Sequence, residues 1–211
     1  ALATAAIAGQ GAKEWAVGGS FALGTVVATT EAKLANSAVY ASNDIGLSSL
    51  DASGTLNGAG SFQGSGKVAA GAAVSVYTLV NSIKSTVEDS ELSAGNDIYL
   101  NSKNIAVIGN LAVAGQGAKE YAVGGSVAVN TMVSTTQSLM KGSTASAGND
   151  VAIEGLDVSV AGAAAGAIQG AGTAAVGLAV AVNSLVGTLA SGMEDSKVLT
   201  AHDVHLHTTD A

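Results

Sequence analysis

The residues best suited to metal chemistry are three histidines near the end of the sequence, His202, His205 and His207. In an extended strand, His205 and His207 face the same way and lie roughly 6.5–7 Å apart along the backbone, so two imidazoles can meet one ion. Fifty-three residues earlier, however, the chain has Ala152 and Glu154, which are typical of an ordinary outer surface. We therefore predict no metal site.

Two acidic pairs, Glu88-Asp89 and Glu194-Asp195, are the candidates for acid–base catalysis. Adjacent residues of a strand point to opposite faces, so neither pair forms an acid–base pair by itself. No Ser-His-Asp grouping, phosphate-binding loop or arginine accompanies them in the sequence. We predict no catalytic residue and no cofactor, and we expect that the chain is not an enzyme.

An Asn-Asp dipeptide marks a turn that recurs along the chain. It stands at 43–44, 96–97 and 149–150, and His202-Asp203 takes its place at the next step. Asn tolerates positive φ and Asp bonds its own backbone, which favours a turn. Calcium needs several clustered oxygens, and one Asp in 53 residues is too sparse for that.

Four Gln-Gly pairs show that the sequence is a tandem array, because each lies 53 residues after the one before it. They stand at 10–11, 63–64, 116–117 and 169–170. A gapless repeat indicates one continuous solenoid. We predict a single β-solenoid segment over residues 1–211, with units at about 1–53, 54–106, 107–159 and 160–211, and we expect it to belong to a longer array.

Each unit contains strand patterns. After the Asn-Asp turn, Val151 and Ile153 alternate with Ala152 and Glu154, so we expect the aliphatic pair inside and Glu154 outside. Upstream, residues 127–133 read as a second strand with both faces nearly buried. We expect Val129 to point inward there. The same expectation covers its equivalents Leu23, Val76 and Val182. Residues 158–161, matched by 105–108, are a third candidate strand.

A helical fold does not suit the chain, because the Ala-rich run 162–177 has a Gly every few residues and no charged face. The fold class we predict is all-β, a parallel β-helix of four 53-residue repeats. A coil in such folds takes roughly 18–22 residues and advances about 4.8 Å. We therefore expect three short coils in each unit, with two coils of about 26 residues as the alternative.

Composition limits the classes of partner and of binding site that the chain can have. The net charge is −8, and the basic residues are eight lysines without an arginine, which disfavours nucleic acid. The chain has no cysteine, so disulfides and thiolate metal sites are excluded. Aromatic residues make up only 3%, which favours a thin core of small side chains.

Two further features allow a binding role. Trp15 and Tyr121 occupy the same repeat position beside Lys-Glu, and we expect them to fill a gap under a loop rather than to bind a ligand. The run 158–193 carries no charge, and its glycines at 162, 166 and 170 have small-xxx-small spacing. The same register elsewhere contains charged residues, so membrane contact is not favoured.

The segments Gly-Gly-Ser-Val-Ala-Val-Asn (124–130) and Ala-Gly-Asn-Asp-Val-Ala-Ile (147–153) resemble the repeats of very large secreted exoproteins. Those are leukotoxin-like and filamentous-haemagglutinin-like adhesins of Gram-negative bacteria, exported by type V (two-partner or autotransporter) routes. The resemblance implies a right-handed β-helical shaft that is secreted or lies on the bacterial outer surface and serves virulence. It assigns export or toxicity to no residue.

We therefore expect a structural and interaction segment, a rod-like shaft of a large bacterial cell-surface or secreted adhesin or exotoxin. Its expected partners are a host cell surface protein or glycan, reached through the parent protein, and flanking β-helix coils of the same parent. The alternatives are a membrane-active, leukotoxin-like segment and, less favoured, a β-helical enzyme that acts on polysaccharides.

Overall fold

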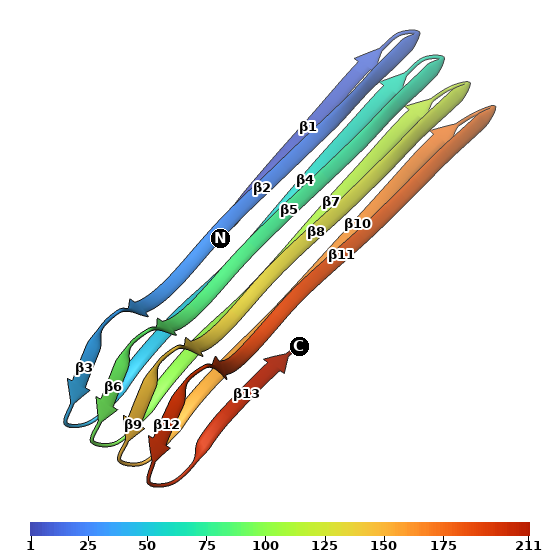
Figure 1. Ribbon diagram of the computed structural model, residues 1–211. Coiled ribbons are helices and arrows are strands. Elements are labelled where there is room, and N and C mark those ends of the chain that lie inside the picture. The colour runs from blue at the N-terminus through green and yellow to red at the C-terminus, as the bar shows by residue number, and fades with distance from the viewer.

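Thirteen parallel strands and no helix build the chain, which a computed structural model describes over residues 1–211. Figure 1 shows them wound into a long flat blade. One face is sheet A, made of β1 (Leu2–Ala12), β4 (Ile45–Ser65), β7 (Ile98–Ala118), β10 (Val151–Ala171) and β13 (Val204–Asp210). The other face is sheet B, made of β2 (Trp15–Ala35), β5 (Val68–Glu88), β8 (Tyr121–Lys141) and β11 (Ala174–Glu194). Sheet C closes one end with β3 (Ala38–Ala41), β6 (Glu91–Ala94), β9 (Thr144–Ala147) and β12 (Lys197–Thr200).

The register of every strand pair joins residues 53 apart. Val127, for example, pairs with Val74 on one side and Val180 on the other. Each coil therefore passes once through sheets A, B and C and returns one strand further along. This arrangement confirms the predicted all-β parallel β-helix.

The expected number of coils is wrong. One repeat makes one coil, neither three nor two, because two of its strands are 21 residues long. The Ala-rich run 162–177 lies almost entirely within strands, in β10 and β11. Residues 105–108 and 158–161, expected to form a separate strand, lie within β7 and β10.

The strand after the Asn-Asp turn is oriented as predicted. Val151, Ile153 and their partners Ile98 and Leu100 are fully buried, whereas Glu154 is exposed. With Val87, Leu92 and Met140 they form the largest apolar core, at the end where sheet C widens the cross-section (Figure 1). The wider section at this end gives room for the larger aliphatic side chains.

The second strand is oriented opposite to the prediction. Ala128 is fully buried, whereas Val129 is half-buried and lies on the outer side of β8. Its equivalents Leu23 and Val182 are 58% and 45% exposed, and Val76 is half-buried. Around Ala128 the space between sheets A and B is filled by small side chains at alternate positions, and the valines lie outside. Further along the same strands the interior holds larger residues, Leu79 and Met132. The core here consists of alanines, namely Ala22, Ala59, Ala73, Ala112, Ala114 and Ala128.

Polar side chains stack inside the blade in ladders that run from coil to coil. The Nε2 of Gln116 donates to Oε1 of Gln63 at 3.0 Å, and that of Gln169 donates to Oε1 of Gln116 at 2.9 Å. Asn104 donates in the same way to the buried carboxylate of Asp157 at 3.0 Å. A buried polar group without a partner is costly, so these ladders help to fix the register.

The turn between sheets B and C has one left-handed residue in each coil. The four residues are Asn36, Asp89, Gly142 and Asp195, with φ of 49°, 45°, 57° and 49°. Asn, Asp and Gly are the residues that tolerate this region of backbone space. This turn thus repeats with the same 53-residue period as the strands.

Candidate interaction surface

A continuous uncharged surface covers part of the outer side of sheet B. We define the apolar face as the alternate residues, beginning with the first, of the four register-matched segments 17–27, 70–80, 123–133 and 176–186. These segments contain no Asp, Glu, Lys, Arg or His. Alternation along β8 places Val123, Val127 and Val129 outward, while Ala122, Ala128 and Asn130 are fully buried.

The apolar face consists of rows that cross the four strands. Two neighbouring rows are almost purely aliphatic, and they comprise Phe21, Val74, Val127 and Val180, then Leu23, Val76, Val129 and Val182. The next row carries hydroxyls, from Thr25, Thr78, Thr131 and Ser184. Strand geometry gives the face a length of about 36 Å and a width of about 19 Å.

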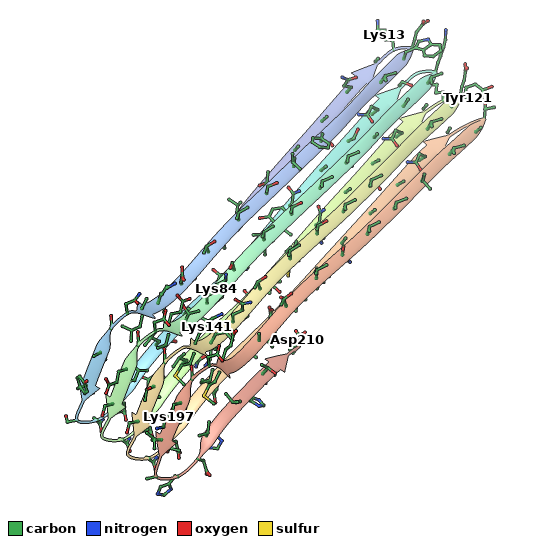
Figure 2. The ribbon with its side chains drawn as sticks, viewed as in Figure 1. Lys13, Lys84, Tyr121, Lys141, Lys197 and Asp210 are labelled. Carbon is green, nitrogen blue, oxygen red and sulfur yellow. The ribbon has the colours of Figure 1, made fainter.

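Charged residues border the apolar face at both ends of the blade. Figure 2 shows Lys13 and Tyr121 at the tip, with Lys84 and Lys141 toward the end that carries sheet C. The Nζ of Lys141 lies 3.1 Å from Oε2 of Glu194 in the next coil. Lys33 and Glu88 form a similar pair at 2.6 Å. These exposed pairs join neighbouring coils and contribute little stability individually.

The same contacts shift the pKa of the two lysines. The hydrogen bond to Glu88 raises the pKa of Lys33, and the hydrogen bond to Glu194 raises that of Lys141. A raised pKa extends the charged range of the two ammonium groups to higher pH.

The outer side of sheet A is apolar as well but uneven, because glycines alternate with large side chains. Two shallow hollows of ≈220 Å³ and ≈280 Å³ meet at Gly58 and Leu111. Phe62 and Ile7 line the second hollow. The apolar face of sheet B is the more regular surface, since its rows repeat similar residues.

The structure brings together a set of metal-ligand types that differs from the histidine pair considered in the sequence. One ligand atom each from Asp150, Asp203 and His205 lies within 4.8 Å of the others. His205 and His207 both lie exposed on β13, and Nε2 of His207 is 2.8 Å from Oγ1 of Thr209. The sequence analysis identified the 53-residue period but did not apply it to this group, in which the period places Asp150 beside Asp203.

The Asn-Asp turns form a ladder of hydrogen bonds between coils. Oδ1 of Asp97 accepts from Nδ2 of Asn149 at 2.9 Å and from the backbone N–H of Asp150 at 3.0 Å. Asp44 accepts from Asn96 and Asp97 in the same way. The bond from Asn149, followed by that from the Asp150 amide, lowers the pKa of Asp97. The turn is present where the sequence predicted it, but its Asp side chains bond to the next coil rather than to their own backbone, and its Asn residues do not have positive φ.

The two Glu-Asp pairs are divided between a strand and a turn. Glu88 and Glu194 end β5 and β11 and bind lysines of neighbouring coils. Asp89 and Asp195 are the left-handed turn residues that follow. The Glu of each pair thus makes an ion pair, and the Asp serves as the turn residue.

We expected Trp15 and Tyr121 to fill a gap under a loop, and the structure places them elsewhere. They begin β2 and β8 at the tip of the blade and are 64% and 46% exposed. The uncharged run 158–193 folds into parts of β10 and β11. No helix of the structure is long and apolar enough to span a membrane.

Sequence reasoning missed the apolar face, although its signal was present in the absence of charge from four matched segments. The valines were assigned to the interior instead. No family model, curated protein or solved structure matches the chain.

Proposed function

We propose that the chain is a structural and interaction segment of a large bacterial cell-surface or secreted protein of the adhesin or exotoxin type. In this role the coils provide a stiff scaffold, and the apolar face provides the surface through which the scaffold associates with partners. The association is non-catalytic and takes place through a large area rather than a pocket.

The observation that carries the proposal is the apolar face itself. Exposed apolar patches larger than a few hundred Å² mark interaction sites in most proteins. Here the rows at Val127 and Val129 continue through all four coils without a charge. The bacterial and extracellular parts of the proposal depend on the resemblance of 124–130 and 147–153 to type V exoprotein repeats.

Surface display of the 211-residue chain on a laboratory bacterium tests this role. We expect displaying cells to attach to host epithelial cells or to one another more strongly than cells with an empty display vector. Display of the Val127→Lys variant should reduce attachment, because a charge interrupts the apolar face. Gln137→Lys is the matched control, since it adds the same charge to an outward position of β8 beyond that face. If display produces no attachment of either kind, the proposal is wrong.

A membrane-active segment is the second candidate, and a different feature of the same face favours it. The apolar face is about 36 Å long, close to the roughly 30 Å hydrocarbon core of a bilayer. Trp15 and Tyr121 lie at its end, where aromatic residues favour a membrane interface. Dye release from liposomes tests this candidate. Release at micromolar protein that is lost in Val127→Lys, or in Gly166→Asp on the outer side of sheet A, would support membrane activity over the scaffold role.

A further inference from the structure

We infer that the apolar face pairs with the apolar face of a second copy of this chain, so that two blades pack sheet against sheet. The inference rests on the proposed interaction role and names the partner. It concerns lateral pairing of coils and is separate from the stacking of coils within one chain.

The first argument is area. The apolar face measures about 36 Å by about 19 Å, or roughly 700 Å², and a stable interface of standard size buries about 800 Å² on each partner. A second copy presents a face of the same length and width. Pairing of two identical faces is isologous, and such two-fold dimers are the commonest oligomers.

The second argument is the regularity of the rows. Val74, Val127 and Val180 lie side by side on neighbouring strands, and the row of Val76, Val129 and Val182 follows two residues later. Rows of identical β-branched side chains on flat sheets interdigitate to form dry interfaces about 10 Å apart. The outer side of sheet A lacks this regularity because of its hollows at Gly58.

The third argument is charge. The chain carries sixteen acidic residues and a net charge of −8, yet none of the sixteen lies in the four segments of the apolar face. Two copies therefore meet there without repulsion between like charges at the contact. A basic partner would find no carboxylate to bind within the face, and an acidic partner would find no cation.

The hydroxyl row favours a protein sheet over a bilayer as the occupant. Thr25, Thr78 and Thr131 cross the face between aliphatic rows, and Val27, Val80 and Val133 form the next one. Hydrocarbon offers these hydroxyls no hydrogen-bond partner. Hydroxyls of a facing sheet can bond to one another across the interface.

Sedimentation equilibrium of the 211-residue chain is the first test. We expect a dimer at roughly 10 µM, above the Kd range of most interfaces of this size. Val127→Lys buries an unpaired charge in the interface and should raise the dimer Kd by about 100-fold or more. Gln137→Lys should leave the Kd unchanged. Circular dichroism of each variant shows whether the strands persist.

Site-specific labelling is the second test, because the natural chain has no cysteine. Pyrene attached to Val129→Cys should give excimer fluorescence in the dimer, since the label lies within the paired face. Pyrene attached to Glu154→Cys, on the outer side of β10, should give none. Excimer from both positions would indicate non-specific association and would overturn the inference.

The remaining outcomes are distinguishable. If the chain stays monomeric at roughly 10 µM, the inference is wrong. If that monomer binds to vesicles, a membrane is the favoured partner instead. A monomer whose display still causes attachment to host cells leaves the proposed function intact. If the chain forms a dimer that depends on Val127 but displaying cells do not attach, the inference is supported and the proposed function is wrong.

Discussion

Gln116 and Gly124 face each other across the interior of the blade, and the glycine leaves the space that the glutamine occupies. A Cβ added at Gly124 would collide with Oε1 of Gln116 and would lie 2.7 Å from Nε2 of Gln169. Gln116 is held by hydrogen bonds to Gln63 and Gln169, so it cannot move without breaking the ladder. The same contact recurs between Gln63 and Gly71 and between Gln169 and Gly177, so the recurring glutamine and the recurring glycine belong to one packing contact.

We predict that Gly124→Ala destabilises the chain, whereas Gly117→Ala does not. The added methyl at Gly124 overpacks the glutamine ladder and should cost about 1–3 kcal/mol in the free energy of unfolding. Gly117 points outward with nothing within 4 Å of an added Cβ. Alanine there should be neutral or stabilise by up to about 1 kcal/mol, because Gly weakens a strand. Urea denaturation measures both, and equal losses would contradict the contact.

A second pair of variants tests which side of β8 faces inward. Ala128 is fully buried and Val129 lies on the outer side. Ala128→Asp buries a carboxylate without a partner and should cost several kcal/mol, about 3 or more. Val129→Asp should cost less than about 1 kcal/mol in the monomer, as surface substitutions do. The reverse order of unfolding free energies would restore the orientation expected from the sequence.

The fold class was predictable because the repeat is gapless and its turns recur in register. The number of coils was not predictable, because the length of a strand depends on the residues of the neighbouring strands and of the facing sheet. The Gly and Ala residues within 109–118 are poor strand formers, but each pairs in register with a strand on either side. Ala112, for example, pairs with Ala59 and Ala165. Their small side chains also allow sheet B to approach. The tertiary contact therefore outweighed the local propensity.

The apolar face was missed for a related reason. Alternation of Val with Ala or Ser fixes which residues share a side, but it does not say which side is inner. Val129 was predicted to be the inner residue because it has the larger apolar side chain. In a thick core, burial of the larger side chain would be the more favourable arrangement. In this part of the two-sheet blade the inner positions hold small residues such as Ala128 and Ser126, whereas four residues further along β8 the interior holds Met132.

Acid should weaken the turn ladder at Asp97. Its folded-state pKa is lowered, chiefly by the hydrogen bond from Asn149, relative to the ordinary value of 3.8. A lowered pKa means that the stabilising contribution is present above pH 3.8 and is lost as pH falls through the folded-state pKa. Asp97→Asn removes this titration, so its urea midpoint should change less than that of the natural chain as pH falls below 3.8. Glu154→Gln is the control, because it removes a carboxylate from the outer side of β10 and leaves the turn intact. Parallel pH profiles for the natural chain and Asp97→Asn would contradict this role.

The shape of the chain in solution distinguishes one coil per repeat from three. With one coil, strands of 21 residues give a blade about 70 Å long, and four coils stack to only about 19 Å. With three short coils per repeat, twelve coils would stack to about 58 Å with a much shorter cross-section. Small-angle X-ray scattering should therefore show a flat particle whose longest dimension lies along the strands, and circular dichroism should be dominated by strand. Scattering from Val127→Lys provides the monomer curve, so that pairing through the apolar face does not alter the dimensions. A curve fitted by a rod of circular cross-section about 58 Å long would contradict the single-coil repeat.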